Sequence, residues 1–472
     1  MVEDMTVTGY SSQNTDVFEE ADSQREEYID VTPYFHIVDA FEVPRWKYNF
    51  ARKNFSSHPD APQLFATAAN KALLFRDRHD LLRQRILRNE NFVPPAFSNR
   101  DKGEYVQLTA ISSLLGREDE SFFLFGMLTQ MEDGKYYLED LDSHVQLDFE
   151  EAHQTTGFFT EGCFVLVDGA YTEDNIFKVK TIGLPPPERR EITKSVFGQV
   201  NFFGAPEETL PMSQLKRIEE SQKDVCFVIL SDVWLDHPMT IPKLRTLLTG
   251  YANALIPLAF IFIGNFVSEP FLYTGKDSAR YKEYFNALGL LIGEFKEICQ
   301  HSQFIFVPGP HDPWGGDVLP RPPIPENFTS QLRKHVPNAI FTSNPCRIKY
   351  CTQEIVIFRE DLINKMRRNC VIKSRKSSES DVKKHLIRTI IDEAHLCPLP
   401  LQVRPISWSY DHALRLYPIP NFLILADKFD PYSVNYEGCQ CVNPGSFVST
   451  DFQFQVYFPG KKLVQLSQLP PT

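Results

Sequence analysis

Polar residues that could take part in metal or phosphate chemistry follow several apolar runs in the second half of the chain. Asp232 and Asn265 each stand just after such a run, and His311 and Asp312 follow a third. A fourth run leads into Asp427. Carboxylates, amide oxygens and imidazoles are the ligands that a hydrolytic two-metal centre uses. These residue types therefore raise the question of a metal-dependent phosphoesterase.

The elements that must position these residues alternate along the chain from residue 196 to the end. The pattern predicts strands at 226–230, 259–263, 304–307 and 422–425, and helices near 242–251 and 279–299. Such alternation is typical of a layered α/β domain, in which ligands bind at the carboxyl ends of the strands. The polar residues lie at those ends.

A different pattern, with a period of two, occupies residues 105–184. Five short strands are predicted, at 122–128, 136–140, 145–149, 163–167 and 176–179, before a Pro-Pro-Pro run at 185–187. Five such strands in under about eighty residues predict a small Greek-key barrel of the OB type. The strands and their flanks carry six acids, which argue against nucleic-acid contact and favour docking to a protein: Glu139, Asp140, Asp142, Asp148, Glu150 and Glu151.

The charge of the chain is concentrated at its amino end. The formal net charge is −12, but residues 1–40 hold ten acids and one base, which leaves −3 for the rest. A nearly neutral body offers no general attraction for nucleic acid, so we expect DNA to be reached only through another chain. Residues 1–30 are expected to be a disordered acidic tail. Residues 71–89 have the spacing of an amphipathic helix, whose arginines we interpret as a solvated face.

Cysteine spacing and hydropathy exclude other classes. Nine cysteines are scattered without a disulfide framework and no secretory leader opens the chain, so we expect reduced thiols in an intracellular protein. The paired knuckles of a zinc site are absent, and no cofactor is predicted. The longest apolar run, 252–267, is shorter than the ~20 residues that a membrane span needs, so no membrane partner is expected.

The order of the four polar loops resembles the calcineurin-like metallophosphoesterase superfamily. That superfamily carries Asp-x-His, Gly-Asp-x-x-Asp, Gly-Asn-His-Asp/Glu and Gly-His-x-His, often followed by Asn-Pro-Gly-Ser, which stands here at 443–446. Asp232 matches the first motif and His311 matches the third. By the resemblance, His311 is a general acid rather than a metal ligand.

Most ligand positions of that superfamily are altered here. The residues that replace metal ligands are Trp234, Asn265, Ser268, Pro310, Asp427 and Phe429. One or two hard ligands cannot hold two metal ions, so the resemblance implies the fold without the metal site and without catalytic residues. The fold class expected is therefore multi-domain α+β: an OB-type barrel and a calcineurin-like α/β domain lacking its metals.

Two other interpretations of these residues remain open. An active metal-dependent phosphoesterase could use an unusual ligand set, with His237, His395 and His412 joining Asp236 and the residues named above. A purely structural interpretation makes Asp232 the cap of the following helix or turn.

An OB barrel directly before a phosphoesterase domain without metals resembles the B subunits of the replicative DNA polymerases. Sequence segments, most of them longer than the loop motifs, place the resemblance in the epsilon branch of that family and extend it over residues 31–472. They are VTPYFH at 31–36, FFG at 202–204, SDVWLD at 231–236, FVPGP at 306–310, LPRPP at 319–323, and the stretches 343–348, 350–355 and 358–362. Members of this branch usually begin with a small helical domain, for which residues 1–30 show no pattern.

The resemblance implies a non-catalytic accessory subunit acting in DNA replication in the nucleus. Its implied partners are the catalytic subunit of the epsilon polymerase, gripped through a zinc-containing C-terminal domain, and the small histone-fold subunits and replisome components of the holoenzyme. The expected organisation is an acidic tail (1–30), a helical and extended region (31–104), the barrel (105–190) and the inactive phosphoesterase-like domain (191–472). The basic stretch 365–384 is interpreted as a solvated or phosphorylatable loop.

Overall fold

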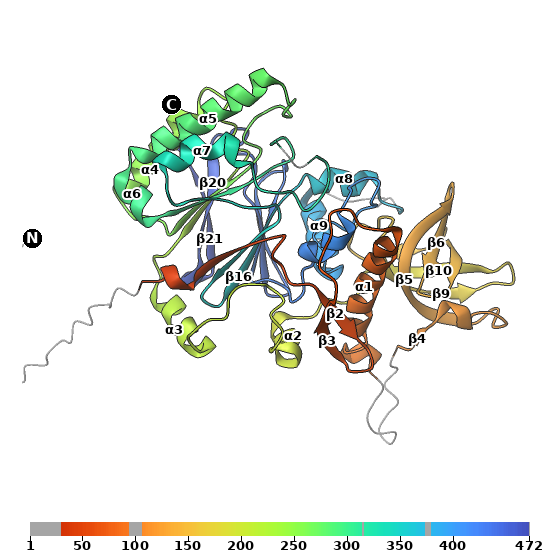
Figure 1. The fold of residues 1–472 in the computed structure, drawn as a ribbon. Coiled ribbons are helices and arrows are strands. Elements are labelled where there is room, and N and C mark those ends of the chain that lie inside the picture. The colour runs from red at the N-terminus through yellow and green to blue at the C-terminus, as the bar shows by residue number, and fades with distance from the viewer. Residues whose placement is uncertain (1–29, 94–105, 314–315, 373–378, 472) are drawn as a thin grey trace, which may run out of the picture.

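The computed structural model describes residues 30–93, 106–313, 316–372 and 379–471. Two six-stranded sheets form the larger part of the molecule, and a β-barrel stands at one end (Figure 1). The acidic tail lies outside the described residues, apart from Asp30.

The first sheet contains three of the four strands predicted for the phosphoesterase-like domain. Its order is β14-β13-β12-β11-β20-β21, with β11 to β14 parallel and β20 antiparallel to β11. The parallel strands β11, β12 and β13 are almost entirely apolar because both of their faces are covered. The strands are β11 (Phe227–Ser231), β12 (Ala259–Ile263), β13 (Gln303–Val307), β14 (Ala339–Phe341), β20 (Gln453–Phe458) and β21 (Leu463–Gln468).

The second sheet, in the order β1-β15-β16-β17-β19-β18, packs face to face on the first. Alternate residues of β11 point to opposite faces, so Phe227 and Ile229 contact the second sheet while Val228 and Leu230 lie under helices. The strands are β1 (Phe35–Asp39), β15 (Cys346–Tyr350), β16 (Gln353–Arg359), β17 (Phe422–Ala426), β18 (Tyr432–Tyr436) and β19 (Cys439–Asn443).

Helices cover the outer faces of both sheets (Figure 1). The single helix predicted at 279–299 is two helices, α5 and α6, because the backbone at Phe295 leaves the helical region (φ −96°, ψ 76°). The helices after the barrel are α2 (Arg190–Phe197), α3 (Met212–Ser221), α4 (Thr240–Ala252), α5 (Gly275–Gly293), α6 (Lys296–His301), α7 (Glu326–His335), α8 (Leu362–Arg368) and α9 (Glu379–Asp392).

The basic stretch 365–384 is not one loop. Lys365 to Arg368 form the last turn of α8, and α9 begins at Glu379. Apolar residues of α8 are buried on one side, which explains why this stretch is helical despite its charge. Residues 373–378 lie outside the described part of the chain.

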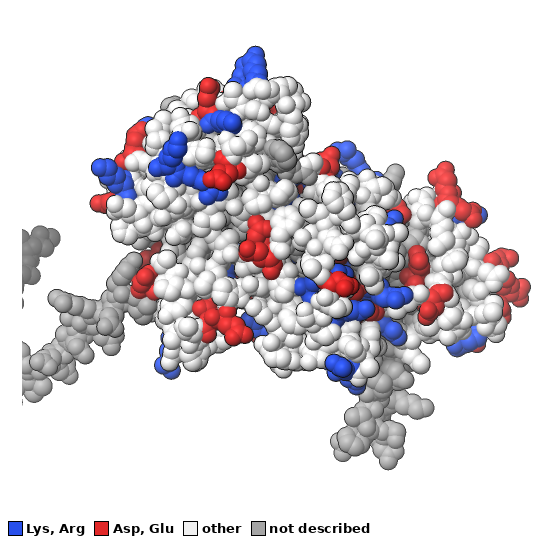
Figure 2. Space-filling model, in the orientation of Figure 1, with Lys and Arg blue, Asp and Glu red and all other residues white. Residues whose placement is uncertain are grey.

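The barrel closes because β9 pairs with both β5 and β10. All five predicted strands are present, joined by two very short ones. They are β4 (Leu108–Thr109), β5 (Ser121–Glu132), β6 (Lys135–Glu139), β7 (His144–Asp148), β8 (His153–Gln154), β9 (Phe164–Tyr171) and β10 (Ile176–Gly183). Figure 2 shows acidic side chains on the outward end of the barrel.

The predicted helix before the barrel is α1 (Ala68–Ile86), preceded by a hairpin of β2 (Trp46–Asn49) and β3 (Asn54–Ser57). The interpretation of its arginines as one solvated face is wrong for Arg78 and Arg85, which are buried. The Arg78 guanidinium donates to both carboxylate oxygens of Asp411, at 3.1 and 2.5 Å. One face of the helix is therefore packed against the barrel and the β2–β3 hairpin, while Arg76 and Arg83 on its other side are exposed.

Buried hydrogen bonds fasten the barrel to α9. The Phe158 N–H donates to the Thr389 hydroxyl at 2.8 Å, and the Phe164 N–H donates to the Glu393 carboxylate at 3.1 Å. A barrel held through buried polar contacts is fixed in orientation on the larger domain.

None of the described helices has the length and hydropathy that crossing a bilayer requires.

Candidate functional site

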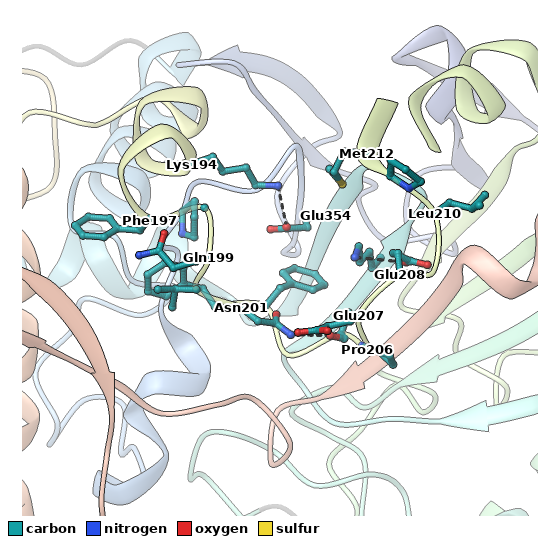
Figure 3. A pocket seen from close by; sticks show the side chains of 18 residues that line it. Lys194, Phe197, Gln199, Asn201, Pro206, Glu207, Glu208, Leu210, Met212 and Glu354 are labelled. Carbon is teal, nitrogen blue, oxygen red and sulfur yellow. Dashed lines mark hydrogen bonds and ion pairs between the residues drawn. The ribbon is translucent and has the colours of Figure 1, made fainter. Parts of the chain in front are cut away.

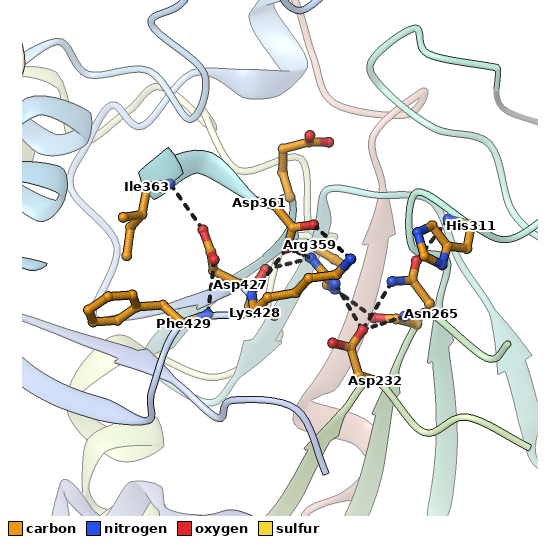
Figure 4. A network of polar contacts seen from close by, with 12 residues as sticks. Asp232, Asn265, His311, Arg359, Asp361, Ile363, Asp427, Lys428 and Phe429 are labelled. Carbon is orange, nitrogen blue, oxygen red and sulfur yellow. Dashed lines mark hydrogen bonds and ion pairs between the residues drawn. The ribbon is translucent and has the colours of Figure 1, made fainter. Parts of the chain in front are cut away.

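The first two polar loops meet at the carboxyl ends of β11 and β12, as the strand pattern predicts. Asp232 accepts hydrogen bonds from the Asn265 N–H at 2.9 Å and from its side-chain amide at 3.1 Å. The side-chain oxygen of Asn265 in turn accepts from the His311 N–H at 2.8 Å. The three predicted positions therefore form one network, which is buried at Asp232 and Asn265 (Figure 4). Asp232 caps no helix, so that structural interpretation is wrong.

A buried arginine occupies the centre of this network. Arg359, at the end of β16 in the second sheet, is fully buried. Its guanidinium donates to Asp232 at 2.8 Å, to Asp361 at 2.8 Å and to the Gly264 carbonyl at 2.8 Å (Figure 4). Burial lowers the pKa of Arg359, but the two carboxylates more than offset this and leave that pKa above its ordinary value. A permanent cation thus links the loops of one sheet to the other sheet.

Asp312 holds the loop after β13 in place. It accepts from the Gly309 N–H at 2.7 Å, the Phe266 N–H at 2.9 Å and the Tyr281 hydroxyl at 3.0 Å. Burial raises the pKa of Asp312 to about 6, although these three donors oppose the shift. A Cβ added at Gly264 would lie 2.1 Å from the Asp312 carboxylate, so the loops approach too closely for a larger residue there.

His311 lies at the edge of the network and is only half-buried. Burial and the nearby charge of Lys428 lower the pKa of His311, which favours the neutral imidazole. Its Nδ1 atom is buried and has no hydrogen-bond partner among the described residues. A hydrogen bond with the backbone of Val267, in the loop after β12, opposes the lowering of the pKa, so the imidazole is held beside the polar loops without contacting the Asp232 carboxylate.

The remaining altered positions serve separate local contacts. Ser268 donates through its N–H and hydroxyl to Asp236, at 3.0 and 2.6 Å, rather than joining Asp232. The Trp234 carbonyl accepts from the Thr240 hydroxyl at 2.6 Å, at the start of α4. Pro310 lies in the loop after β13 and is half-buried.

Asp427 and Phe429 belong to a second polar group beside the first. Asp427 accepts from the Ile363 N–H at 3.1 Å, in the first turn of α8, and from the Phe429 N–H at 3.0 Å (Figure 4). Burial, together with the Asp361 charge, raises the pKa of Asp427. The Phe429 ring packs against the apolar core beneath the second sheet. These positions are therefore used for capping and packing.

The residues do not fit the two metal ions that a calcineurin-like domain implies. The described residues contain no group of three or more His, Cys, Asp and Glu side chains able to hold a metal ion. The guanidinium of Arg359 already supplies a positive charge to Asp232, and a dication beside it would be repelled.

The histidines of the alternative ligand set are dispersed. The His395 ring bonds to Asp411 at 3.2 Å, and the His412 ring bonds to the Val43 carbonyl at 3.0 Å. Burial lowers the pKa of His395 to about 4 and that of His412 to about 3. Neither histidine belongs to the network around Arg359, so the alternative of an active phosphoesterase is not favoured.

A surface pocket of about 430 Å³ lies elsewhere, between α2, the start of α3 and the second sheet (Figure 3). Four of its charged groups form two ion pairs, Lys194 with Glu354 at 3.5 Å and Lys349 with Glu208 at 3.4 Å. Glu207 also lines the pocket and is exposed, so both lysines of the lining are already paired and Glu207 is left as the carboxylate outside these pairs.

Sequence reasoning missed Arg359 and Asp361. Both lie in the segment 358–362, which carries part of the family resemblance, but neither matches a metal-ligand position. They come from the second sheet, 127 residues after Asp232 in the case of Arg359. The available signal was an arginine directly after the apolar run 355–358, because an arginine at the end of a buried strand needs a carboxylate partner, although the sequence does not say which one.

An OB barrel fastened to a two-sheet phosphoesterase-like domain is the domain pair of the DNA polymerase B subunits. Residues 227–434 match the model of the family described as the B subunit of DNA polymerase alpha/epsilon, and residues 68–186 match that of the OB-fold domain of DNA polymerase epsilon subunit 2-like proteins. The chain belongs to this family of B subunits, in its epsilon branch.

Relatives named as epsilon subunits match nearly the whole chain. DNA polymerase epsilon subunit 2 of Homo sapiens is 45% identical over 447 residues, covering 92% of this chain and 83% of that one. The DNA polymerase epsilon B subunit of Arabidopsis thaliana is 42% identical, covering 92% and 82%. A solved archaeal phosphodiesterase covers 52% of this chain and 100% of its own at 10% identity and a TM-score of 0.27, too low to support an argument. The protein is an accessory subunit of the epsilon DNA polymerase, which acts in DNA replication.

Proposed function

We propose that the chain is the scaffold on which the catalytic subunit of DNA polymerase epsilon docks through a zinc-containing C-terminal domain. The observation that carries this proposal is the buried Arg359 network, in which the loops that serve catalysis in a phosphoesterase are tied together by a permanent cation. Asp232, Trp234, Asn265, Ser268, Pro310, His311, Asp427 and Phe429 are then relics of a metal site that now stabilise structure.

The barrel and the larger domain together form the docking platform in this proposal. Buried bonds from Phe158 and Phe164 to α9 hold the barrel in one orientation, so that a partner can span both units. A preorganised surface loses less conformational entropy on binding. The acidic outward end of the barrel suits a protein partner better than DNA.

The wider setting follows from the same proposal. The histone-fold subunits and other replisome components join through the holoenzyme, DNA is reached only through the complex, and the site of action is the nucleus. The organisation proposed remains a tail at 1–30, a helical and extended region at 31–104, the barrel at 105–190 and the inactive domain at 191–472. The pairing of β1 with β15 means that residues 35–39 also contribute to the inactive domain.

Co-expression with the C-terminal domain of the catalytic subunit tests the docking proposal. A stable interface should give a 1:1 complex on size-exclusion chromatography and a melting temperature above that of the chain alone, because a partner that binds only the folded state stabilises it. The same domain with its zinc ligands replaced is the matched control. If the two proteins elute separately and the melting temperature does not change, the scaffold proposal is wrong.

A further inference from the structure

A basic surface lies over α1 and the β2–β3 hairpin, against the acidic trend of the chain. Figure 2 shows lysine and arginine side chains gathered there. Residues 40–90 hold ten bases and five acids, a net charge of +5 in a chain of −12. The basic surface is defined by five side chains of residues that are exposed or half-buried, together with Arg45, whose own side chain is only 9% exposed: Lys47, Arg52, Lys53, Arg76 and Arg83.

Local contacts hold these side chains in one area. Arg45 pairs with Asp77 of α1 at 3.6 Å, and Lys47 also acts on the Asp77 charge. The Arg83 guanidinium lies 5.5 Å from the centre of the Phe50 ring at the tip of the hairpin. The hairpin and the helix are thereby joined, and their positive charges share one face.

Much of this positive charge is not neutralised within the described part of the chain. The side chains of Arg52, Lys53 and Arg76 form no ion pair or hydrogen bond with any described residue. Like charges held side by side repel one another and attract a polyanion. The basic surface therefore calls for an acidic occupant.

The amino end of the same chain has the matching composition. Residues 1–29 hold eight acids and one base, a net charge of −7, and six of the acids fall within 16–27. This segment joins the described chain at Asp30, fifteen residues before Arg45. Those fifteen residues span at most ~50 Å, whereas 29 residues can extend to roughly 95 Å. The acidic stretch is thus within reach of the basic surface.

We propose that the acidic segment 1–29 docks on the basic surface of its own chain and screens it from nucleic acid. Attachment through the chain supplies a high effective concentration, so a purely electrostatic contact can be occupied without a specific fold. The contact weakens as salt rises, because its partners are exposed charges. Displacing the segment would then uncover a phosphate-binding face.

Carbodiimide cross-linking of the full chain tests the contact directly, because it joins a carboxylate to a lysine only where the two touch. At low salt we expect mass spectrometry to find amides between acids of 16–27 and Lys47 or Lys53, and to lose them in 0.5 M NaCl. A Lys276→Arg/Lys334→Arg variant, altered at exposed lysines of α5 and α7, is the matched control and should keep these adducts. Adducts mainly on lysines outside the basic surface, or none at all, would overturn the proposal.

Binding of a fluorescein-labelled 20-nucleotide oligo(dT) and of a 20-base-pair duplex provides the second test. Removing residues 1–29, or changing the six acids of 16–27 to Asn and Gln, should tighten binding at least ~10-fold at low salt. A charge reversal of Arg52, Lys53 and Arg76 in the shortened chain should abolish the gain. If the full chain already binds either probe as tightly as the shortened one, the surface is open to nucleic acid and the tail does not cover it.

Discussion

The guanidinium of Arg359 is the residue on which the site depends. Its three nitrogen atoms donate to Asp232, Asp361 and the Gly264 carbonyl, and these bonds join loops of the first sheet to the end of a strand in the second. A cation of fixed shape satisfies the carboxylates without the open coordination positions that hydrolysis needs. Arg359 can therefore hold these loops together in the position that a metal ion would otherwise take beside Asp232.

Replacing this arginine should destabilise the protein strongly. Arg359→Met leaves Asp232 and Asp361 without their shared cation, at a cost of about 3–5 kcal/mol in the free energy of unfolding. Urea denaturation followed by circular dichroism measures the change. Arg367→Met, at an exposed position on α8, is the control and should change stability by less than ~0.5 kcal/mol.

Neutralising the two carboxylates should restore part of that loss. Arg359→Met combined with Asp232→Asn and Asp361→Asn removes the buried charges that the arginine balanced. If Arg359→Met alone lowers the free energy of unfolding no more than the Arg367→Met control does, the guanidinium does not stabilise the network.

At this scale the sequence predicts only half of the site. The closeness of Asp232, Asn265 and His311 follows from parallel strands whose ends share one edge. The packing of one sheet on the other brings Arg359 to them. Arg359 and Asp232 are 127 residues apart in the sequence, and no local pattern predicts their contact. The replaced ligand positions could be read from the sequence, but the cation that pairs with Asp232 could not.

Among the elements, α9 connects the barrel to the second sheet and carries a buried carboxyl at its end. Burial raises the pKa of Glu393 to about 8. The Phe164 N–H and the charges of Arg78 and Arg85 act in the opposite direction, but their combined effect is smaller. The neighbouring Asp392 has its pKa raised to about 7, also by burial. This junction between the barrel and the second sheet is therefore sensitive to pH.

Stability should fall as pH rises from 5 to 8 because of Glu393. In the unfolded chain this carboxyl loses its proton near pH ~4.3, whereas in the folded protein it keeps the proton until about pH 8. Over that interval the folded state binds the extra proton, so deprotonation favours unfolding by up to ~1.4 kcal/mol per pH unit. Glu393→Gln removes this titrating group. The urea concentration at the unfolding midpoint of the variant, relative to that of the unaltered protein, should therefore increase as the pH rises from 5 to 8.

The exposed Glu297→Gln variant provides the comparison for this experiment. Its urea midpoint should follow that of the unaltered protein at every pH, since an exposed carboxyl has no burial to relieve. A constant difference between Glu393→Gln and the unaltered protein from pH 5 to 8 would mean that Glu393 is already ionised in the folded state.

Helices and strands with an uninterrupted apolar pattern can be predicted from the sequence. Elements in which apolar residues are mixed with polar or charged ones cannot. The predicted bounds of the buried strands β11, β12, β13 and β17 lie within one residue of the observed ones at either end. The strand β1 escapes prediction because its half-buried residues include His36 and Asp39. The burial of α1 escapes it because its charges, such as Arg78, are matched by partners far away in the chain.

At the scale of the whole molecule, the chain is a two-part body in which Arg359 joins the loops at the carboxyl edge of the first sheet to the second sheet. The barrel is fixed to the larger domain through α9, and α1 fills the angle between them. The acidic and basic regions lie on different parts of this body, with acids on the barrel and bases over α1 (Figure 2). Such a distribution orients partners of opposite charge rather than binding a substrate.

The most direct test of this account is the metal content of the purified chain together with its manganese-stimulated hydrolysis of bis(p-nitrophenyl) phosphate. With Arg359 in the network, we predict no stoichiometric metal and no turnover above that of Asp232→Asn measured in parallel. One or more metal ions per chain, with turnover that Asp232→Asn abolishes, would contradict the account and show that the site is catalytic.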